Sequence, residues 1–280
     1  MSQALETPVW RVRGGAAQAT NDRVAIERAL EIWVRAGDVE TLVTTTMRTP
    51  GQDQALALGF LFAEGVLTGR DAIVAVETRS DDAVLIELPA HAAAAVTAAE
   101  RPFVTSAACG ACGRRSQDGV AAPVAALAAA PRAPRLTAAA VAALPGNLRR
   151  AQVIFDDTGG LHAAGLFAID AADAAPGIAR AVHEDVGRHN AVDKVVGTML
   201  LEGALPLADT VLVVSGRASY ELVQKAAAAG IPILAAVGAP SSLAVENAVR
   251  AGMTLLGFVR DGGFNVYCGA DRLAGLSLGA

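Results

Sequence analysis

Two cysteines placed three positions apart are the residues whose type and spacing point most directly to chemistry. Cys109 and Cys112 lie in the run Cys-Gly-Ala-Cys-Gly, and Arg114 and Arg115 follow directly. A cation beside a thiol favours the thiolate, which is the nucleophilic and metal-binding form of cysteine. The run therefore suits a persulfide carrier, a thiol–disulfide switch or half of a metal site better than a pair of small apolar fillers.

A structural zinc site is the main alternative for these thiols. Such a site normally takes four Cys or His ligands, commonly as two closely spaced pairs. The sequence offers one Cys pair, a lone Cys268 and scattered histidines. A thioredoxin-like site expects its CxxC pair at a strand-to-helix junction, whereas this pair precedes an Ala/Pro-rich stretch. We therefore predict no metal site and assign no role to Cys268.

Residues 183–190, His-Glu-Asp-Val-Gly-Arg-His-Asn, form a second chemically dense cluster. They lie between a predicted strand and a predicted helix, and such junctions line the ligand crevice of open α/β sheets. The cluster is equally compatible with a ligand or acid–base site and with a capped helix end that carries solvated charges. The sequence leaves this choice open.

Two glycine-containing loops are candidates for binding an anionic ligand. Ser215, Gly216 and Arg217 follow a predicted strand and precede a predicted helix, where backbone N–H groups favour an anion and an arginine can grip a phosphate. A capped helix with a surface arginine is the alternative. The other loop follows the last predicted strand of the sheet, and loops at the carboxyl ends of neighbouring strands share one crevice. Its residues are Phe258, Val259, Arg260, Asp261, Gly262 and Gly263.

The elements that precede the cysteine pair are short strands around one helix. Residues 24–47 and 73–88 predict two hairpins. Between them, Thr49-Pro50-Gly51-Gln52 has the pattern of a capped helix start, followed by a helix over residues 55–66. We therefore predict an α+β domain over residues 20–118 that ends in the CxxC loop, and an Ala/Pro-rich linker over residues 119–135.

From residue 136 to residue 280 the pattern changes to alternating strands and helices. This alternation predicts a three-layer α/β/α domain with a largely parallel sheet. Two of its strands are continuously apolar, as expected for strands covered on both faces. The predicted strands are 163–169, 178–184, 211–214, 233–237 and 254–259, and the predicted helices are 138–143, 191–201, 220–229 and 242–251.

Composition excludes several classes of protein. The apolar fraction of 53% against 18% charged residues excludes a disordered chain. The net charge of −5 argues against a sequence-blind nucleic-acid binder. Three cysteines do not make a secreted disulfide framework. The longest uncharged run, between Lys225 and Glu246, is broken by two glycines and two prolines, so we expect strand and turns rather than a membrane span. These observations predict a cytoplasmic protein that binds neither nucleic acid nor membrane.

Taken together, the motifs resemble those of the FdhD family, the formate dehydrogenase accessory sulfurtransferases. The resemblance extends from about residue 24 to residue 267. It rests on MRTPGQDQALALGFLFAEGVL, TSAACGACGRRS, TGGLHAAGLF, EDVGRHNAVDKVVG, VSGRASYELVQKAAAAGIPILAAVGAPSSLAVENA and GMTLLGFVRDGGFNVY.

The resemblance implies a cytidine deaminase-like C-terminal domain and an enzyme that moves sulfur. Members of the family carry sulfur from a cysteine desulfurase to the molybdenum cofactor, Mo-bis-molybdopterin guanine dinucleotide, of formate dehydrogenase. Cys109 matches the persulfide-bearing cysteine and Cys112 the second cysteine of the motif. The family's cofactor-binding stretch falls on residues 258–263, although Gly263 stands where the family often has arginine. The cofactor is a client rather than a permanent prosthetic group, and a homodimer is expected.

Two other functions remain as alternatives. A zinc-dependent deaminase expects His-x-Glu followed later by Pro-Cys-x-x-Cys, whereas here the CxxC pair lies far upstream of His183. A non-catalytic chaperone of the molybdenum cofactor would need the crevice but not Cys109.

Overall fold

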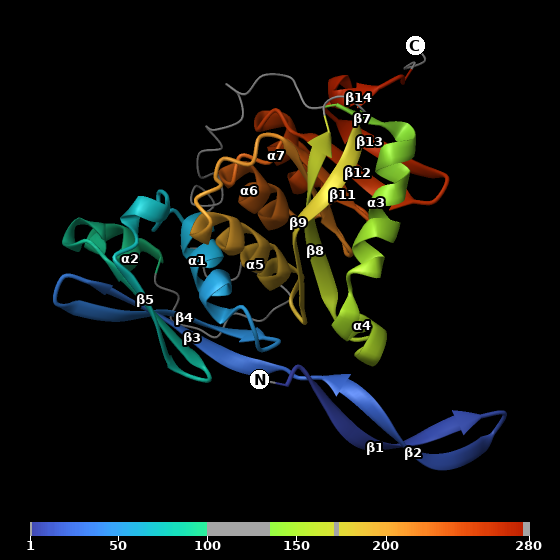
Figure 1. The fold of residues 1–280 in the computed structure, drawn as a ribbon, viewed down its shortest axis with the longest axis horizontal. Helices are drawn as coiled ribbons and strands as arrows, with labels where there is room; N and C mark the ends of the chain where they lie inside the picture. The colour runs from blue at the N-terminus through green and yellow to red at the C-terminus, as the bar shows by residue number, and fades with distance from the viewer. Residues whose placement is uncertain (1, 100–134, 171–173, 277–280) are drawn as a thin grey trace.

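The computed structural model describes residues 2–99, 135–170 and 174–276 (Figure 1). Within these ranges the strands form one sheet of six strands, one of four, and two pairs. Cys109, Cys112, and the predicted linker except for Arg135 lie outside the described residues.

The six-stranded sheet has the order β13-β12-β11-β10-β8-β9, and its strands run in mixed directions. Only the pairs β10–β11 and β11–β12 are parallel, while β8 is antiparallel to β10 and to β9, and β12 is antiparallel to β13. The prediction of a largely parallel sheet is therefore wrong, because three of the five strand pairs are antiparallel. Two residues separate β12 from β13, and so short a connection can join only antiparallel strands. The strands are β8 His162–Asp170, β9 Ala175–Asp185, β10 Thr210–Val214, β11 Ile233–Ala236, β12 Thr254–Arg260 and β13 Gly263–Cys268.

Helices cover both faces of this sheet, so the predicted three layers are present. In β10, Val211 and Val213 pack with α3 (Ala138–Arg150), while Leu212 and Val214 pack with the helices of the opposite face. This alternation is what the two-residue period of a strand requires when both faces are buried. The opposite face is covered by α5 Arg188–Leu201, α6 Tyr220–Ala228 and α7 Ser242–Arg250. The likeness to a cytidine deaminase fold stays a prediction.

The smaller sheet has the order β4-β3-β6-β5 and packs against α1 (Asp53–Ala63). Both predicted hairpins are confirmed, but the predicted start of the helix is wrong. Gln52, not Thr49, occupies the N-cap position of α1, with a left-handed φ of 59° and no side-chain cap. Thr49 is fully buried and bonds to the chain around Asp185 instead. The strands are β3 Arg28–Ala36, β4 Val39–Arg48, β5 Ala75–Ser80 and β6 Ala83–Leu88.

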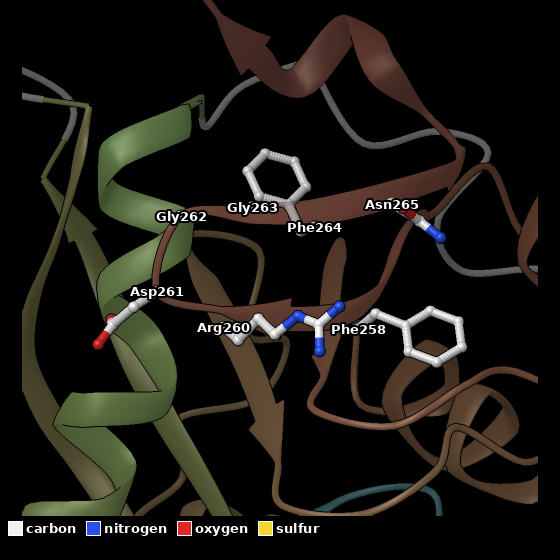
Figure 2. A pocket seen from close by; sticks show the side chains of 7 residues that line it. All are labelled: Phe258, Arg260, Asp261, Gly262, Gly263, Phe264 and Asn265. Atoms are coloured by element: carbon white, nitrogen blue, oxygen red, sulfur yellow. The ribbon is translucent and has the colours of Figure 1, made fainter.

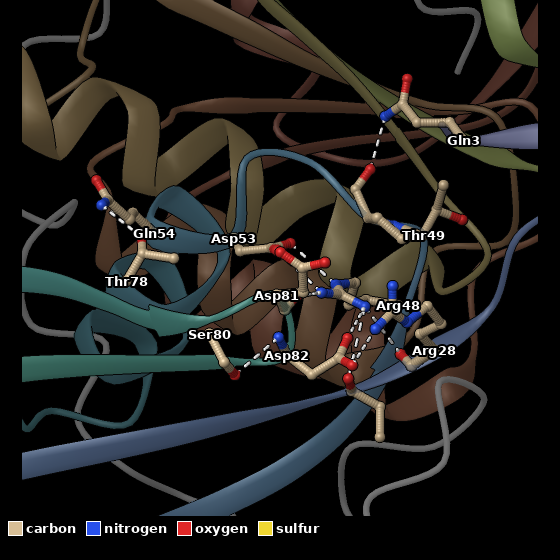
Figure 3. A network of polar contacts seen from close by, with 12 residues as sticks. Gln3, Arg28, Arg48, Thr49, Asp53, Gln54, Thr78, Ser80, Asp81 and Asp82 are labelled. Carbon is tan, nitrogen blue, oxygen red and sulfur yellow. Dashed lines mark hydrogen bonds and ion pairs between the residues drawn. The ribbon is translucent and has the colours of Figure 1, made fainter. Parts of the chain in front are cut away.

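The corner between β4 and α1 is held by a buried arginine (Figure 3). Arg48 is completely buried and bonds both carboxylate oxygens of Asp53 at 2.9 Å, and Asp82 at 3.3 Å. A bidentate pair of this kind fixes geometry as well as charge. It sets the direction in which α1 leaves the small sheet.

Helices α1 and α5 join the two sheets through an unusually close contact between glycines. A Cβ built on Gly197 of α5 lies 1.8 Å from the carbonyl oxygen of Ala55, and one built on Gly59 of α1 lies 2.0 Å from that of Asp193. Only glycine leaves room for the two backbones at these points.

The remaining elements are short or peripheral, except for a hairpin at the N-terminus that the sequence analysis did not predict. Helix α3 also runs seven residues beyond its predicted end, through Pro145. None of the helices among the described residues is long and apolar enough to cross a membrane. The N-terminal hairpin consists of β1 Ala4–Arg13 and β2 Ala16–Ala25. The short elements are η1 Arg70–Ala72, η2 Ala90–Ala92, α2 Ala93–Ala99, β7 Leu136–Thr137, α4 Val153–Thr158, η4 Ala270–Arg272 and β14 Leu273–Ala274.

Candidate functional site

The loops that follow β10 and β11, and Phe258 near the end of β12, lie side by side at one end of the large sheet. The N–H of Gly238 donates to the carbonyl of Gly216 at 3.0 Å, and the N–H of Phe258 donates to the carbonyl of Gly238 at 3.1 Å. A Cβ on Gly238 would lie about 3.0 Å from the Cγ of Arg217, so glycine lets the loops approach. The structure therefore places the two predicted anion-binding loops on either side of the loop that follows β11.

A pocket of about 580 Å³ opens beside the β12–β13 turn. Its volume falls in the usual range of small-molecule sites. In Figure 2 the guanidinium of Arg260 extends toward Phe258, whereas the carboxylate of Asp261 points away from it. The lining residues are Phe258, Arg260, Asp261, Gly262, Gly263, Phe264 and Asn265.

Not every predicted residue of this stretch faces the pocket. Val259 is fully buried in the core between the sheet and α3. Ser215, Gly216 and Arg217 lie one loop away and do not line it. The predicted residues thus divide into a pocket at the β12–β13 turn and a crevice at the end of β10.

Phe258 has a strained backbone at the mouth of the pocket. Its φ is 53°, in the left-handed region, and the β12–β13 register is irregular between Gly257 and Arg260. For a residue with a Cβ this conformation costs about 1–2 kcal/mol. The ring remains 40% exposed. Strain of this kind is concentrated at ligand sites, so it marks Phe258 as a candidate contact.

Two further side chains face the crevice: His162, which the sequence analysis did not select, and Arg188, which belongs to the predicted cluster at residues 183–190. A Cβ on Gly216 would lie 3.5 Å from Nδ1 of His162 and 3.8 Å from Cδ of Arg188. Burial lowers the pKa of His162, and Arg188 and Arg217 lower it further while Asp185 opposes them. Arg188 lies beside Gly216 and Arg217 follows Gly216 in the chain, so the crevice has two arginines near it, which suits an anionic ligand.

The antiparallel direction of β8 explains why His162 was missed. His162 is the first residue of β8. If β8 ran parallel to β10, His162 would lie at the other end of the sheet from the carboxyl end of β10. The strands are antiparallel instead, and Ala164 pairs with Val214 at that carboxyl end. The Ala163 N–H also donates to Oγ of Ser215 at 2.9 Å. Only a correct strand direction could have brought His162 to the loops.

Most of the cluster at residues 183–190 is structural. Asp185 is fully buried, lies 2.7 Å from Nζ of Lys194, and accepts from the N–H groups of Gly187 and Thr49 and from Asn190. Burial raises the pKa of this carboxyl, and Lys194 opposes the shift. These contacts favour a structural role at the start of the helix over an acid–base site. The expected solvated charges are, however, wrong, because Glu184 and Asp185 are buried and engaged in polar contacts.

The neighbouring side chains of the cluster are also engaged. Glu184 accepts from the N–H groups of Ile154 and Phe155 at 2.8 and 2.7 Å, at the start of α4. His183 bonds to Thr198 at 2.9 Å, and burial lowers its pKa to about 4. A neutral, bonded His183 and a Glu184 bound to backbone do not form a deaminase-type pair.

Of the three cysteines, Cys268 is the one that lies among the described residues. Cys268 is half-buried, its Sγ lies 3.3 Å from the carbonyl oxygen of Met253, and burial raises its pKa. Across residues 2–99, 135–170 and 174–276, no group of three His, Cys, Asp or Glu side chains could hold a metal. Cys109 and Cys112 lie outside these ranges, so the absence of metal there stays a prediction.

Comparison with known proteins gives one consistent family. The model of the FdhD/NarQ family matches residues 25–274. A sulfur carrier protein FdhD from Streptomyces avermitilis is 44% identical over 275 residues, covering 95% of this chain and 94% of the relative. Proteins of the same name from Mycobacterium tuberculosis and Sulfurisphaera tokodaii are 43% and 37% identical, covering 90% and 97% of this chain and 92% and 99% of their own.

A solved structure has the same fold. It is a protein from Desulfotalea psychrophila described as a candidate formate dehydrogenase accessory protein, with a TM-score of 0.74 at 24% identity. The match covers 97% of this chain and all of the other.

Proposed function

Because the chain belongs to the FdhD/NarQ family, we propose that it is a sulfurtransferase that carries sulfur for formate dehydrogenase. The observation that carries this proposal is the set of relatives named sulfur carrier protein FdhD, which are 43–45% identical over at least 89% of the chain. An identity this high over nearly the whole length favours a shared activity as well as a shared fold.

Cys109 is the proposed carrier. Its thiolate attacks the terminal sulfur of a persulfide on a cysteine desulfurase, the donor S–S bond breaks, and the donor cysteine leaves as a thiolate. The new S–S bond leaves a persulfide on Cys109, with no net gain or loss of electrons. Arg114 and Arg115 support this step because a neighbouring cation increases the thiolate fraction. Thiolate chemistry needs a reducing compartment, so we propose that the protein acts in the cytoplasm.

The crevice is the proposed place of the acceptor, the bis-molybdopterin guanine dinucleotide form of the molybdenum cofactor, which is bound as a client. Arg188 and Arg217 beside Gly216 suit its phosphates. The exposed ring of Phe258 and the guanidinium of Arg260 suit a flat heterocycle, through stacking and hydrogen bonding. Formate dehydrogenase and the desulfurase are then the protein partners.

Mass spectrometry of persulfide formation tests the carrier role. The full chain is incubated with an active desulfurase and cysteine, and the peptide that contains Cys109 is expected to gain one sulfur atom. Cys109→Ala is expected to abolish the gain, whereas Cys268→Ala is a matched control that keeps it. A gain that persists in Cys109→Ala contradicts the assignment.

The same variant separates this function from a non-catalytic chaperone. If Cys109→Ala restores full formate dehydrogenase activity to cells that lack the protein, delivery of cofactor without sulfur transfer is the better description. The Cys112→Ala variant, measured in both assays, shows whether the second thiol acts in loading or only in delivery.

A further inference from the structure

A second pocket lies at the opposite ends of α5 and α6 from the crevice. The crevice is built around the start of α5 and the loop before α6, whereas this pocket is lined by residues in the last turn of each helix. Its volume is about 570 Å³, which lies in the usual range of small-molecule sites. The lining residues are Phe62, Thr68, Gly69, Arg70, Asp71, Leu200, Gly203, Leu205, Pro206 and Ala228.

Part of the lining is apolar. Phe62 of α1 and Leu205 of the loop after α5 are partly buried, and both pack against the core of the small sheet and the core of the large one. Leu200 and Pro206 add aliphatic surface. The ring of Phe62 suits a second bulky apolar group, through stacking or edge contacts. The pocket therefore offers a surface for an apolar side chain.

The rest of the lining includes one charge of each sign. Arg70 and Asp71 are consecutive residues of η1, and both are exposed. The guanidinium of Arg70 lies over the loop that follows α5, because a Cβ built on Gly203 would lie 3.5 Å from its Nη1. A guanidinium can bind a carboxylate through two parallel hydrogen bonds, so Arg70 suits an anionic group of a ligand.

Three helices end at this pocket. Phe62, Leu200 and Ala228 lie in the last turns of α1, α5 and α6. The carboxyl end of a helix carries a partial negative charge and favours a cation. Together with the carboxylate of Asp71, these helix ends favour a positive group on the ligand, while Arg70 favours a negative one.

We propose that this pocket binds a zwitterion with a large apolar side chain, which is the chemistry of a free apolar amino acid. Its carboxylate pairs with Arg70, its ammonium group lies near Asp71 and the helix ends, and its side chain lies against Phe62 and Leu205. A purely anionic ligand would meet Asp71 and three helix ends, and a purely cationic ligand would meet Arg70. The inference is independent of the sulfur-carrier proposal, because it uses neither the crevice nor Cys109.

Calorimetric titration of the full chain with three matched probes tests the class of ligand. L-Phenylalanine carries both charges, 3-phenylpropionate lacks the ammonium group, and phenethylamine lacks the carboxylate. We expect one L-phenylalanine per chain with a Kd below about 1 mM, and binding about tenfold or more weaker for each single-charge probe, which is the worth of a charged hydrogen bond. The proposal is overturned if L-phenylalanine shows no saturable binding in this range, or if a single-charge probe binds as tightly.

Two variants that remove one charge each assign the two ends of the ligand. Arg70→Gln should weaken L-phenylalanine and 3-phenylpropionate about tenfold and leave phenethylamine unchanged. Asp71→Asn should weaken L-phenylalanine and phenethylamine and leave 3-phenylpropionate unchanged. Arg250→Gln changes an exposed arginine at the end of α7 and is the matched control, with no expected effect. Equal losses for all three probes, or the same loss in the control, contradict the proposed placement.

Filling the pocket gives a test that leaves both charges in place. Ala228 is exposed in the last turn of α6, so Ala228→Leu adds volume at the pocket without entering the core. Its Tm should equal that of the wild type, because alanine and leucine are both strong helix formers. Its affinity for L-phenylalanine should fall about tenfold or more as the added side chain takes the apolar surface from the ligand. An unchanged affinity would place the bound amino acid elsewhere and overturn the proposal.

Discussion

Enlarging Gly197 by a single methyl group should separate the two halves of the molecule. In Gly197→Ala the new Cβ starts 1.8 Å from the carbonyl oxygen of Ala55, whereas real Cβ contacts are not found below 3.0 Å. Helices α1 and α5 must therefore move apart by at least 1.2 Å. The obstacle is backbone on both sides, so no side chain can rotate away to absorb the change.

The loss in free energy of unfolding follows from the contacts that this separation of α1 and α5 weakens. A gap of about 1 Å forfeits a quarter to a half of the dispersion energy along the contact. It also strains the bond from Nζ of Lys194 to the carbonyl of Thr49, now 2.8 Å, which satisfies a buried charge. Overpacking alone costs about 1–3 kcal/mol, and alanine returns about 1 kcal/mol of helix propensity. A weakened buried polar contact adds about 1–3 kcal/mol, so we expect a net loss of about 1–5 kcal/mol, centred near 3 kcal/mol.

Thermal and denaturant unfolding measure this loss. At about 2 °C per kcal/mol for a chain of this size, the Tm of Gly197→Ala should fall by roughly 6 °C. Gly146→Ala in α3 is the matched control, because its Cβ would meet only the guanidinium end of Arg150, at 3.6 Å. That variant should be neutral or up to about 1 kcal/mol more stable. A Tm for Gly197→Ala within a degree of the wild type refutes the close contact.

Three further predictions concern charge and strain. The pKa of His183 lies at about 4 instead of 6.5. The free energy of unfolding therefore has its full His183 contribution above pH 6.5 and loses up to about 3 kcal/mol as the pH falls through about 4. His183→Gln should flatten the curve of stability against pH in this window, and an unchanged slope contradicts the lowered pKa. Arg48→Met should lower the free energy of unfolding by about 3–5 kcal/mol because it leaves Asp53 without its bidentate partner. The control Arg79→Met breaks the more exposed pair with Glu40 and should cost at most about 1 kcal/mol. Equal costs would contradict the role of burial. Phe258→Gly should keep or raise the Tm, since it releases about 1–2 kcal/mol of backbone strain. If the proposed cofactor binds in the pocket, the same variant should bind it more weakly. A lower Tm with unchanged binding would show that the ring serves the core rather than the pocket.

The periodicity of the sequence predicted most elements but not their directions. The apolar runs around Val211 and Ile233 are strands because their side chains must be buried on both faces, and this is visible in a single segment. Whether β8 runs with or against β10 depends on pairing between distant segments, which local patterns do not record. The missed position of His162 is the direct consequence.

The mistaken helix start at Thr49 has a related cause. The sequence Thr-Pro-Gly-Gln has the composition of a cap, and in isolation the threonine side chain would accept from the helix N–H groups. Asp185 offers the Thr49 N–H a buried carboxylate at 3.1 Å, and the Thr49 hydroxyl accepts from Val186 at 3.2 Å. Tertiary contacts with a residue 136 positions away outweighed the local preference, so the chain uses Thr49 to attach one sheet to the other.

The N-terminal hairpin of β1 and β2 escaped prediction because it leaves little pattern in the sequence. Its residues show no strong alternation of hydrophobic and polar types beyond Trp10 and Val12, and a two-stranded ribbon has no core whose burial would leave a pattern.

The cluster at residues 183–190 shows how chemical density can be misread. Carboxylates and imidazoles that lie close together suggest an acid–base site. Here the carboxylate of Asp185 accepts hydrogen bonds from the N–H groups of Gly187 and Thr49 and pairs with Lys194. Those bonds fix where α5 begins, and Arg188 is its first residue. The buried pair of Asp185 and Lys194 therefore affects the crevice indirectly, because it fixes the start of α5 and so places Arg188 beside Gly216. Substituting Asp185 should thus disturb the fold and the crevice together, whereas substituting Arg217, which is exposed, should affect the crevice alone.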